Sequence, residues 1–183
     1  MIRSIALPTC LMASLLVASL VAAPAPALSR AGPAAPAATP EALAAAASAC
    51  RSVIVDGQSP APAFAPAGLS GPGEAHPGLG QAFFPNAVDL VWFRRTLGTG
   101  MIQGVVSASE KSCTLFLLGA PGGAAVDQVV AGLAGWRLMK EEADARIYFR
   151  KSADGATLIT SINLGPEAVL PGQIGALIKV YRL

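Results

Sequence analysis

The order of hydrophobic and polar positions predicts a helix early in the chain. Thr39 and Pro40 have the character of an N-cap and a first helical residue, and an alanine-rich block follows to about Cys50. Residues 53–55 are predicted as a short strand or extended exit from this helix. Segment 82–97 fits two structures: a short helix or irregular segment, which is preferred, or a strand with alternating apolar positions.

Beyond Gly100 the pattern predicts strands around one further helix. Residues 101–108 and 113–118 form a hairpin, and 124–135 carries valines at helical spacing. A meander is expected over 137–142, 145–151 and 157–164, followed by a final strand over 174–182. These elements predict an α+β fold, with two helices packed on a mostly antiparallel sheet of about five to six strands (hairpin, helix, meander, C-terminal strand).

A tract rich in proline and glycine separates the first helix from the strands. No regular element is expected over 57–80. The tract is interpreted as a variable surface loop, or as a flap over a binding groove with Phe64 and His76 as its distinctive side chains.

The first 27 residues have the order of a secretory signal peptide: Arg3, then an apolar run from Leu11 to Ala23, then small residues ending at Ala27. The apolar run would span only about 20 Å as a helix, against about 30 Å of hydrocarbon. Residues 28–38 are predicted as a Pro/Ala-rich disordered spacer, and 39–183 as a single α+β domain. The heavy alanine, proline and glycine content suggests a GC-rich bacterial genome, so we expect a protein of the periplasm or the medium, with no transmembrane anchor after signal cleavage.

Composition excludes some partners. The net charge is only +2, from 13 basic and 11 acidic residues, so nucleic acid is not expected as a partner. Charged residues make up only 13% of the chain, against roughly 25% in typical domains.

Two of the three cysteines would remain after export, because Cys10 lies before the apolar run and leaves with the signal. In an oxidising compartment Cys50 and Cys113 are predicted to form a disulfide, worth roughly 4 kcal/mol in the chain-entropy model. The alternatives are two buried free thiols, or a nucleophile or metal ligand, which would need a nearby histidine.

No motif supports catalysis, a metal or a cofactor, and none is expected. The single histidine, His76, lies in the flexible tract without an orienting partner. Ser70 lacks the surroundings of a nucleophile elbow, and the loop 119–123 matches no phosphate-binding spacing. The carboxylates form no recognisable pair or cluster.

One sheet face is the main candidate for binding. Alternation over 146–150 predicts Ile147 and Phe149 inward, and Arg146, Tyr148 and Arg150 outward. Lys179 and Tyr181 of the last strand extend this basic, aromatic surface if the faces coincide. Arginine and tyrosine often carry binding energy in interfaces, although a solvated sheet face is the simpler interpretation.

The sequence thus predicts an exported, small, non-enzymatic binding or accessory domain. Its expected partner is a protein or another envelope component. The alternative is a small exported hydrolase with a site that the sequence does not reveal.

Overall fold

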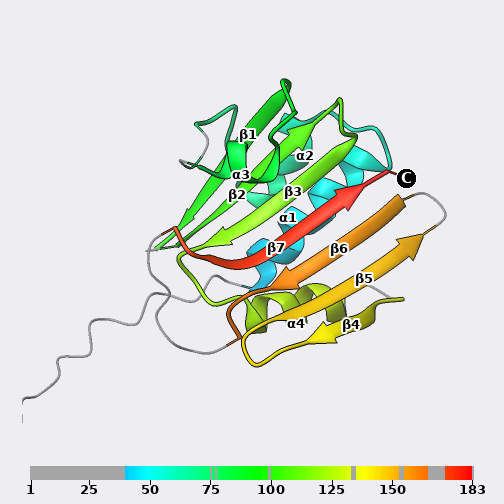
Figure 1. Ribbon diagram of the computed structural model, residues 1–183. Coiled ribbons are helices and arrows are strands. Elements are labelled where there is room, and N and C mark those ends of the chain that lie inside the picture. Colours follow the sequence, from blue (N-terminus) through cyan, green and yellow to red (C-terminus); the bar gives the residue numbers. More distant parts are fainter. Residues whose placement is uncertain are drawn as a thin grey trace, which may run out of the picture. The chain divides into compact units, whose positions relative to one another are not determined.

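The computed structural model describes residues 40–182 except 75, 77, 99, 133–134, 153–154 and 165–171. The predicted signal peptide (1–27) and spacer (28–38) lie outside the described residues. Within these, a seven-stranded sheet has the order β1-β2-β3-β7-β6-β5-β4, and all neighbours are antiparallel (Figure 1). The strands are β1 (Leu90–Leu97), β2 (Gly100–Ser107), β3 (Ser112–Leu118), β4 (Arg137–Glu141), β5 (Arg146–Ser152), β6 (Gly155–Ser161) and β7 (Ile174–Tyr181). The helices are α1 (Pro40–Ile54), α2 (Pro60–Phe64), the 3₁₀ turn η1 (Ala65–Ala67), α3 (Leu79–Phe83) and α4 (Gly123–Ala131).

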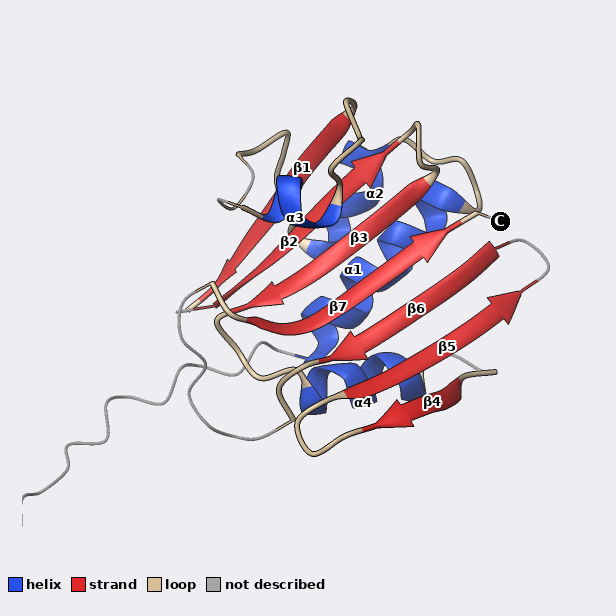
Figure 2. Ribbon diagram, viewed as in Figure 1, coloured by secondary structure: helices blue, strands red, loops and turns tan. Residues whose placement is uncertain are grey.

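The helices lie on both sides of this sheet. Figure 2 shows α1, α2 and α4 behind the strands and α3 in front of them. The main core forms where α1 and α4 pack on the sheet, and a smaller apolar cluster forms under α3. We call the face covered by α1 and α4 the helix side, and the opposite face the outer side.

Helix α1 is longer than the sequence predicts. Pro40 begins it, Glu41 lies in the first turn and small residues such as Ala46 and Ala47 are buried, so the helix can approach the sheet closely. The predicted strand or extended exit at 53–55 is wrong, because α1 continues to Ile54. Val53 and Ile54 pack against the core, and this tertiary contact overrides their weak helix propensity.

The Pro/Gly-rich tract 57–80 is not the structureless loop that the sequence predicts. It contains α2 and η1, since proline is tolerated in the first turn of a helix, and Phe64 is fully buried with its ring centroid 4.8 Å from that of Phe93. Ser70 then pairs with Arg94 at the edge of β1. The tract therefore runs from the helix side around the β1 edge and protects that edge from pairing with another chain. Phe64 is a core residue and does not belong to a flap.

Segment 82–97 divides at Leu90: the preferred prediction of a short helix or irregular segment fits residues 82–89, which hold the end of α3 and an irregular stretch, and is wrong for β1. The strand alternative holds from Leu90. Trp92 and Phe93 are both buried although they point to opposite faces, because both faces of the sheet are covered at this point. The same double coverage buries all of β3.

The loop between β3 and α4 packs tightly on β7. A Cβ on Gly175 would lie 1.8 Å from the Ala120 carbonyl oxygen, which explains the glycine. The amides of Gly122 and Gly123 both donate to the Asn163 carbonyl oxygen, at 2.7 and 3.1 Å. These amides at the start of α4 are therefore used for contacts within the fold.

The predicted disulfide is confirmed. Cys50 of α1 is bonded to Cys113 of β3, with 5.5 Å between their Cα atoms and both side chains fully buried. The bond fixes the middle of the sheet to the helix that covers it.

The fold class predicted from sequence is also confirmed in its coarse form, α+β with a mostly antiparallel sheet. The described residues contain seven strands and four α-helices, where five to six strands and two helices were predicted. The difference arises from α2 and α3, which form in proline- and glycine-rich sequence, and from the strand β1.

Candidate functional site

The five residues of the predicted binding face lie on opposite sides of the sheet. In the register, Tyr148 pairs with Ile159, which pairs with Ile178, and both of these isoleucines are buried in the core under α1 and α4. Arg146, Tyr148 and Arg150 therefore lie on the helix side. Lys179 pairs with Leu158, which pairs with Phe149, so Lys179 and Tyr181 lie on the outer side with Ile147 and Phe149. The alternation predicted for β5 is correct, but the two faces are exchanged: Arg146, Tyr148 and Arg150 face the helix side, where Ile147 and Phe149 were expected.

The contacts of Arg146 explain why this side of β5 faces α4. Its Nη1 lies 3.1 Å from Oδ1 of Asp127 on α4 and 3.3 Å from the Tyr148 hydroxyl, and the side chain is only 19% exposed. The Tyr148 ring packs against the core, with the Arg146 guanidinium carbon 6.0 Å from its centre. The arginine thus docks α4 on the edge of the sheet.

We expect Arg146→Ala to lower the free energy of unfolding by about 1 kcal/mol, from the lost ion pair and the lost packing of the arginine stem. Arg137→Ala on β4 is the matched control. Because Arg137 is exposed, this substitution should change the free energy of unfolding by no more than about 0.5 kcal/mol. Urea unfolding of both variants gives the comparison. Equal effects would show that Arg146 does not face α4.

The outer side is covered over only half of its width. Under α3, Phe84 and Phe116 form a compact cluster with Trp92, Val105 and Leu118. The ring centroids of Phe84 and Trp92 are 6.3 Å apart, and those of Phe83 and Phe116 are 4.9 Å apart. This cover lies over β1, β2 and β3. No helix among the described residues covers the outer side of β5 and β6.

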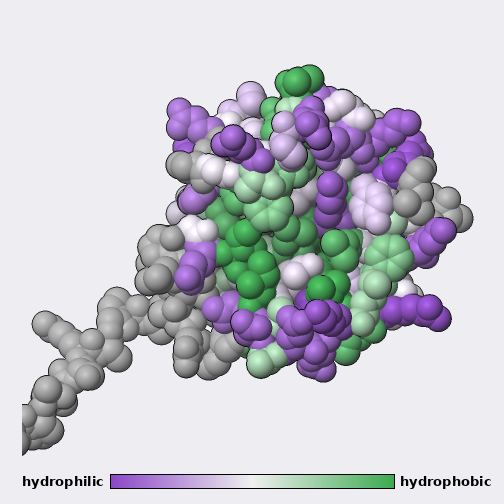
Figure 3. All heavy atoms as spheres, viewed as in Figure 1, coloured by the Kyte–Doolittle hydropathy of each residue, from purple (hydrophilic) through white to green (hydrophobic). Residues whose placement is uncertain are grey.

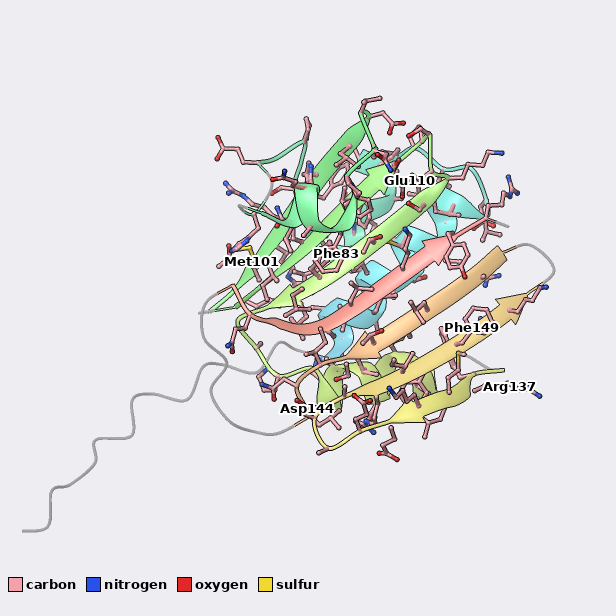
Figure 4. The ribbon with its side chains drawn as sticks, viewed as in Figure 1. Phe83, Met101, Glu110, Arg137, Asp144 and Phe149 are labelled. Atoms are coloured by element: carbon pink, nitrogen blue, oxygen red, sulfur yellow. A yellow bond between two sulfur atoms is a disulfide. The ribbon has the colours of Figure 1, made fainter. Side chains whose placement is uncertain are left out.

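The uncovered half holds an apolar trough of about 370 Å³, which we call the outer trough. Figure 3 shows apolar side chains gathered in the middle of this face with polar ones around them. Phe83 and Ile162 at the trough are 38% and 41% exposed. In Figure 4, Phe83 lies on the α3 side of this region and Phe149 comes from β5 beyond it. The trough is lined by Phe83, Phe84, Thr114, Leu158, Thr160, Ile162, Leu177 and Lys179.

Two polar groups at the trough distinguish it from a plain apolar patch. Thr114 is 1% exposed, and its hydroxyl is buried without a hydrogen-bond partner. Lys179 is its cross-strand neighbour, and the ammonium nitrogen lies 5.5 Å from the centre of the Phe84 ring and 3.4 Å from Oε2 of Glu110. An ammonium has three donors, so Lys179 can bind a second acceptor beside Glu110.

The trough was not predicted because its apolar residues alternate on β6 and β7 with the core residues of the helix side. Leu158 and Leu177 were assigned to strands in the sequence but not to a face. The alternation of side chains along β6 could have shown it, because Leu158 must face the side opposite to the buried Ile159. The unpartnered hydroxyl of Thr114 has no signature in sequence.

His76 is better held than its sequence suggests. The buried side chain of Gln103 accepts a hydrogen bond from the His76 amide at 2.9 Å and donates one to the Glu74 carbonyl at 2.8 Å. The imidazole is half-buried and lies against Gly172, where an added Cβ would come within 3.1 Å of it. The Gln103 side chain therefore holds the backbone at His76, although the sequence places this residue in a flexible tract without an orienting partner.

Asp89 organises the turn between β2 and β3. Its carboxylate accepts hydrogen bonds from the Ser109 amide at 2.6 Å, the Ser109 hydroxyl at 2.7 Å and the Ser107 hydroxyl at 3.0 Å. The hydrogen bonds from Ser109, first that of the side chain and then that of the backbone, lower the pKa of Asp89. This carboxylate has a structural role. Within the described ranges, no group of three or more histidine, cysteine or acidic side chains could hold a metal ion.

Comparison with known proteins yields no relative. No protein-family model matches the chain, and no curated protein or solved structure shows significant similarity to it. Among the described helices, none has both the length and the apolar character needed to cross a membrane. The disulfide is consistent with export to an oxidising compartment. The function therefore has to be inferred from the geometry of the two faces.

Proposed function

We propose that this protein is an exported, non-enzymatic domain that binds a single-chain amphiphile in the outer trough. The ligand class is an acyl chain with a carboxylate or similar acceptor head. The head would accept hydrogen bonds from Thr114 and Lys179, and the chain would lie over Leu158, Leu177 and Ile162.

The observation that carries this proposal is the buried, unpartnered hydroxyl of Thr114 in a mostly apolar trough. A buried polar group without a partner costs about 1–3 kcal/mol, so a partner supplied by a ligand recovers that cost. Sites for small ligands are typically 300–1,000 Å³, mostly apolar, with a few polar groups that fix orientation. The outer trough has this size and this character.

The dimensions favour a chain over a compact ligand. From β3, which carries Thr114, to β5, which carries Phe149, the sheet spans three inter-strand gaps, or roughly 14 Å at about 4.8 Å each. An extended acyl chain of medium length covers that distance. Its apolar path crosses Leu158, which is the direct neighbour of both Lys179 and Phe149 in the register.

The proposal that the domain is exported rests on the predicted signal peptide and on the disulfide. The N-terminal pattern of Arg3, an apolar run and small residues is typical of secreted precursors. The buried Cys50–Cys113 bond fits an oxidising compartment. An exported domain meets membrane lipids and their products there.

Calorimetric titration with dodecanoate tests the function. We expect saturable binding to the wild type, and weaker binding of dodecyltrimethylammonium, whose head cannot accept from Thr114 or Lys179. Leu158→Ser should weaken dodecanoate binding about tenfold, because burial of one leucine side chain is worth about 1.5–3 kcal/mol. Met139→Ser is the matched control: Met139 lies on β4 outside the trough, is 64% exposed, and should leave binding within about twofold.

Thr114→Val separates binding from folding. Valine fills the same space without the unpartnered hydroxyl, so the unliganded variant should be as stable as the wild type or more stable, yet bind dodecanoate several-fold more weakly. Absence of saturable dodecanoate binding would refute the proposal. Undiminished binding by both Leu158→Ser and Thr114→Val would also refute it. Retention of a purified partner protein by the wild type, but not by Leu158→Ser, without any amphiphile binding would assign the trough to protein docking instead.

The hydrolase alternative receives no support from the two concavities of the sheet. Among the described residues, neither those that line the outer trough nor those that line the hollow on the helix side include His76 or a carboxylate. The hydrolase alternative stays a hypothesis from the sequence alone.

A further inference from the structure

A second concavity lies on the opposite side of the sheet, and its chemistry differs from that of the trough. This helix-side hollow is about 190 Å³ and is bounded by α1, α4, Trp136 and the strands β5, β6 and β7. Its floor is made of Ile159, Ile178 and Val180, all buried core residues. The two sites are separated by the sheet, so the inference below does not depend on the proposed function.

Small side chains keep the hollow open. Where α1 passes over β7 it presents Ala44 and Ala47, and α4 presents Gly132 near its end. Larger residues at these positions would fill the space between the helices and the sheet. The volume is close to that of an engineered cavity of about 150 Å³ that admits benzene in another protein.

The hollow presents two hydrogen-bond donor groups, the indole of Trp136 and the guanidinium of Arg150. The indole N–H of Trp136 is buried and has no hydrogen-bond partner. Arg150 runs beside the turn that precedes this tryptophan, with its Nε 3.9 Å from the Cβ position of Gly135. That turn requires glycine, since Gly135 has φ +86°.

Arg150 differs from its neighbour on the same face. Arg146 is paired with Asp127, whereas no carboxylate in the described part of the chain lies within ion-pair distance of Arg150. None of the described residues that line the hollow is acidic, and Arg150 carries a positive charge there, so the electrostatic potential of the hollow favours an anion.

We propose that the helix-side hollow binds a small planar carboxylate that carries one ring or a short branched aliphatic group. The guanidinium of Arg150 matches a carboxylate with two parallel hydrogen bonds, and the indole N–H donates a third. The apolar part of the ligand lies on Ile159, Ile178 and Val180. The hollow is too small for the acyl chain assigned to the trough, so each site selects its own ligand class.

Benzoate is the test ligand, and benzamide is its uncharged control. The chain has two tryptophans, Trp92 under α3 and Trp136 at the hollow, so a ¹H–¹⁵N spectrum shows two indole signals. Trp92→Phe identifies which signal belongs to Trp136. Benzoate should move the Trp136 indole proton downfield in a saturable manner, leave the Trp92 signal unchanged, and bind at least tenfold more tightly than benzamide.

Arg150→Gln should weaken benzoate binding about tenfold or more, because hydrogen bonds to charged groups are the strong ones, while benzamide binding changes little. Arg137→Gln on the exposed strand β4 is the matched control and should leave benzoate binding unchanged. If Arg150→Gln fails to fold, Trp136→Phe provides the second variant, with a loss of several-fold. Equal binding of benzoate and benzamide, no movement of the Trp136 signal at millimolar benzoate, or full affinity in the arginine variant would overturn the proposal.

Discussion

Replacing both Cys50 and Cys113 by alanine is expected to lower the free energy of unfolding by about 4 kcal/mol. The bond joins residues 63 positions apart, and closing a loop of that length restricts the unfolded chain strongly in the entropy model. In the folded state it ties α1 to β3 in the middle of the core. A loss of this size is a large fraction of the 5–15 kcal/mol that is typical for a whole domain.

Urea unfolding of the oxidised wild type and of the double alanine variant measures this difference. The reduced wild type is the control, because it keeps both sulfur atoms in the core and lacks only the covalent bond. Its loss should account for most of the effect of the double variant. Quantitative labelling of two thiols in the unreduced, unfolded protein would contradict the bond itself.

Phe64→Ala is the second large effect, with an expected loss of about 3–5 kcal/mol. Phe64 of α2 is completely buried in the main core and packs on Phe93, so its removal leaves a cavity. Phe149→Ala is the matched comparison. Phe149 lies half-buried on the outer side of β5, so its loss should cost only about 1–2 kcal/mol.

Chemical denaturation of the two phenylalanine variants measures which side chain is more deeply buried. The sequence alone predicts the opposite order from the structure. The sequence places Phe64 in an irregular tract and Phe149 in the core. A larger loss for Phe149→Ala than for Phe64→Ala would contradict the assignment of the helix side and the outer side.

The second half of the chain was predictable because its elements have clear local signals. The hairpin of β2 and β3 has a polar turn at Ser109–Ser112, and α4 carries Val126 and Val129 at helical spacing. The first half was predicted less well. Proline and glycine suggested irregular structure, but Phe64 is buried when α2 forms, and this non-local contact has no local signature.

The orientation of β5 could not be predicted because its apolar face is not the core face. Alternation separates Ile147 and Phe149 from Arg146 and Tyr148, but deciding which pair points inward requires knowing where α4 lies. The usual assumption that apolar residues face the core fails in this strand. Ile147 and Phe149 lie on the half of the outer side that α3 does not cover, beside the trough.

Intermolecular NOE spectra of methyl-labelled protein with dodecanoate test the proposed function most directly. We expect contacts from the acyl chain to the methyl groups of Leu158, Ile162 and Leu177, which line the outer trough. Ile159, Ile178 and Val180 lie on the opposite face of the same strands and should show none. Contacts confined to that second group, or no contacts at saturating dodecanoate, would contradict the outer trough as the binding site.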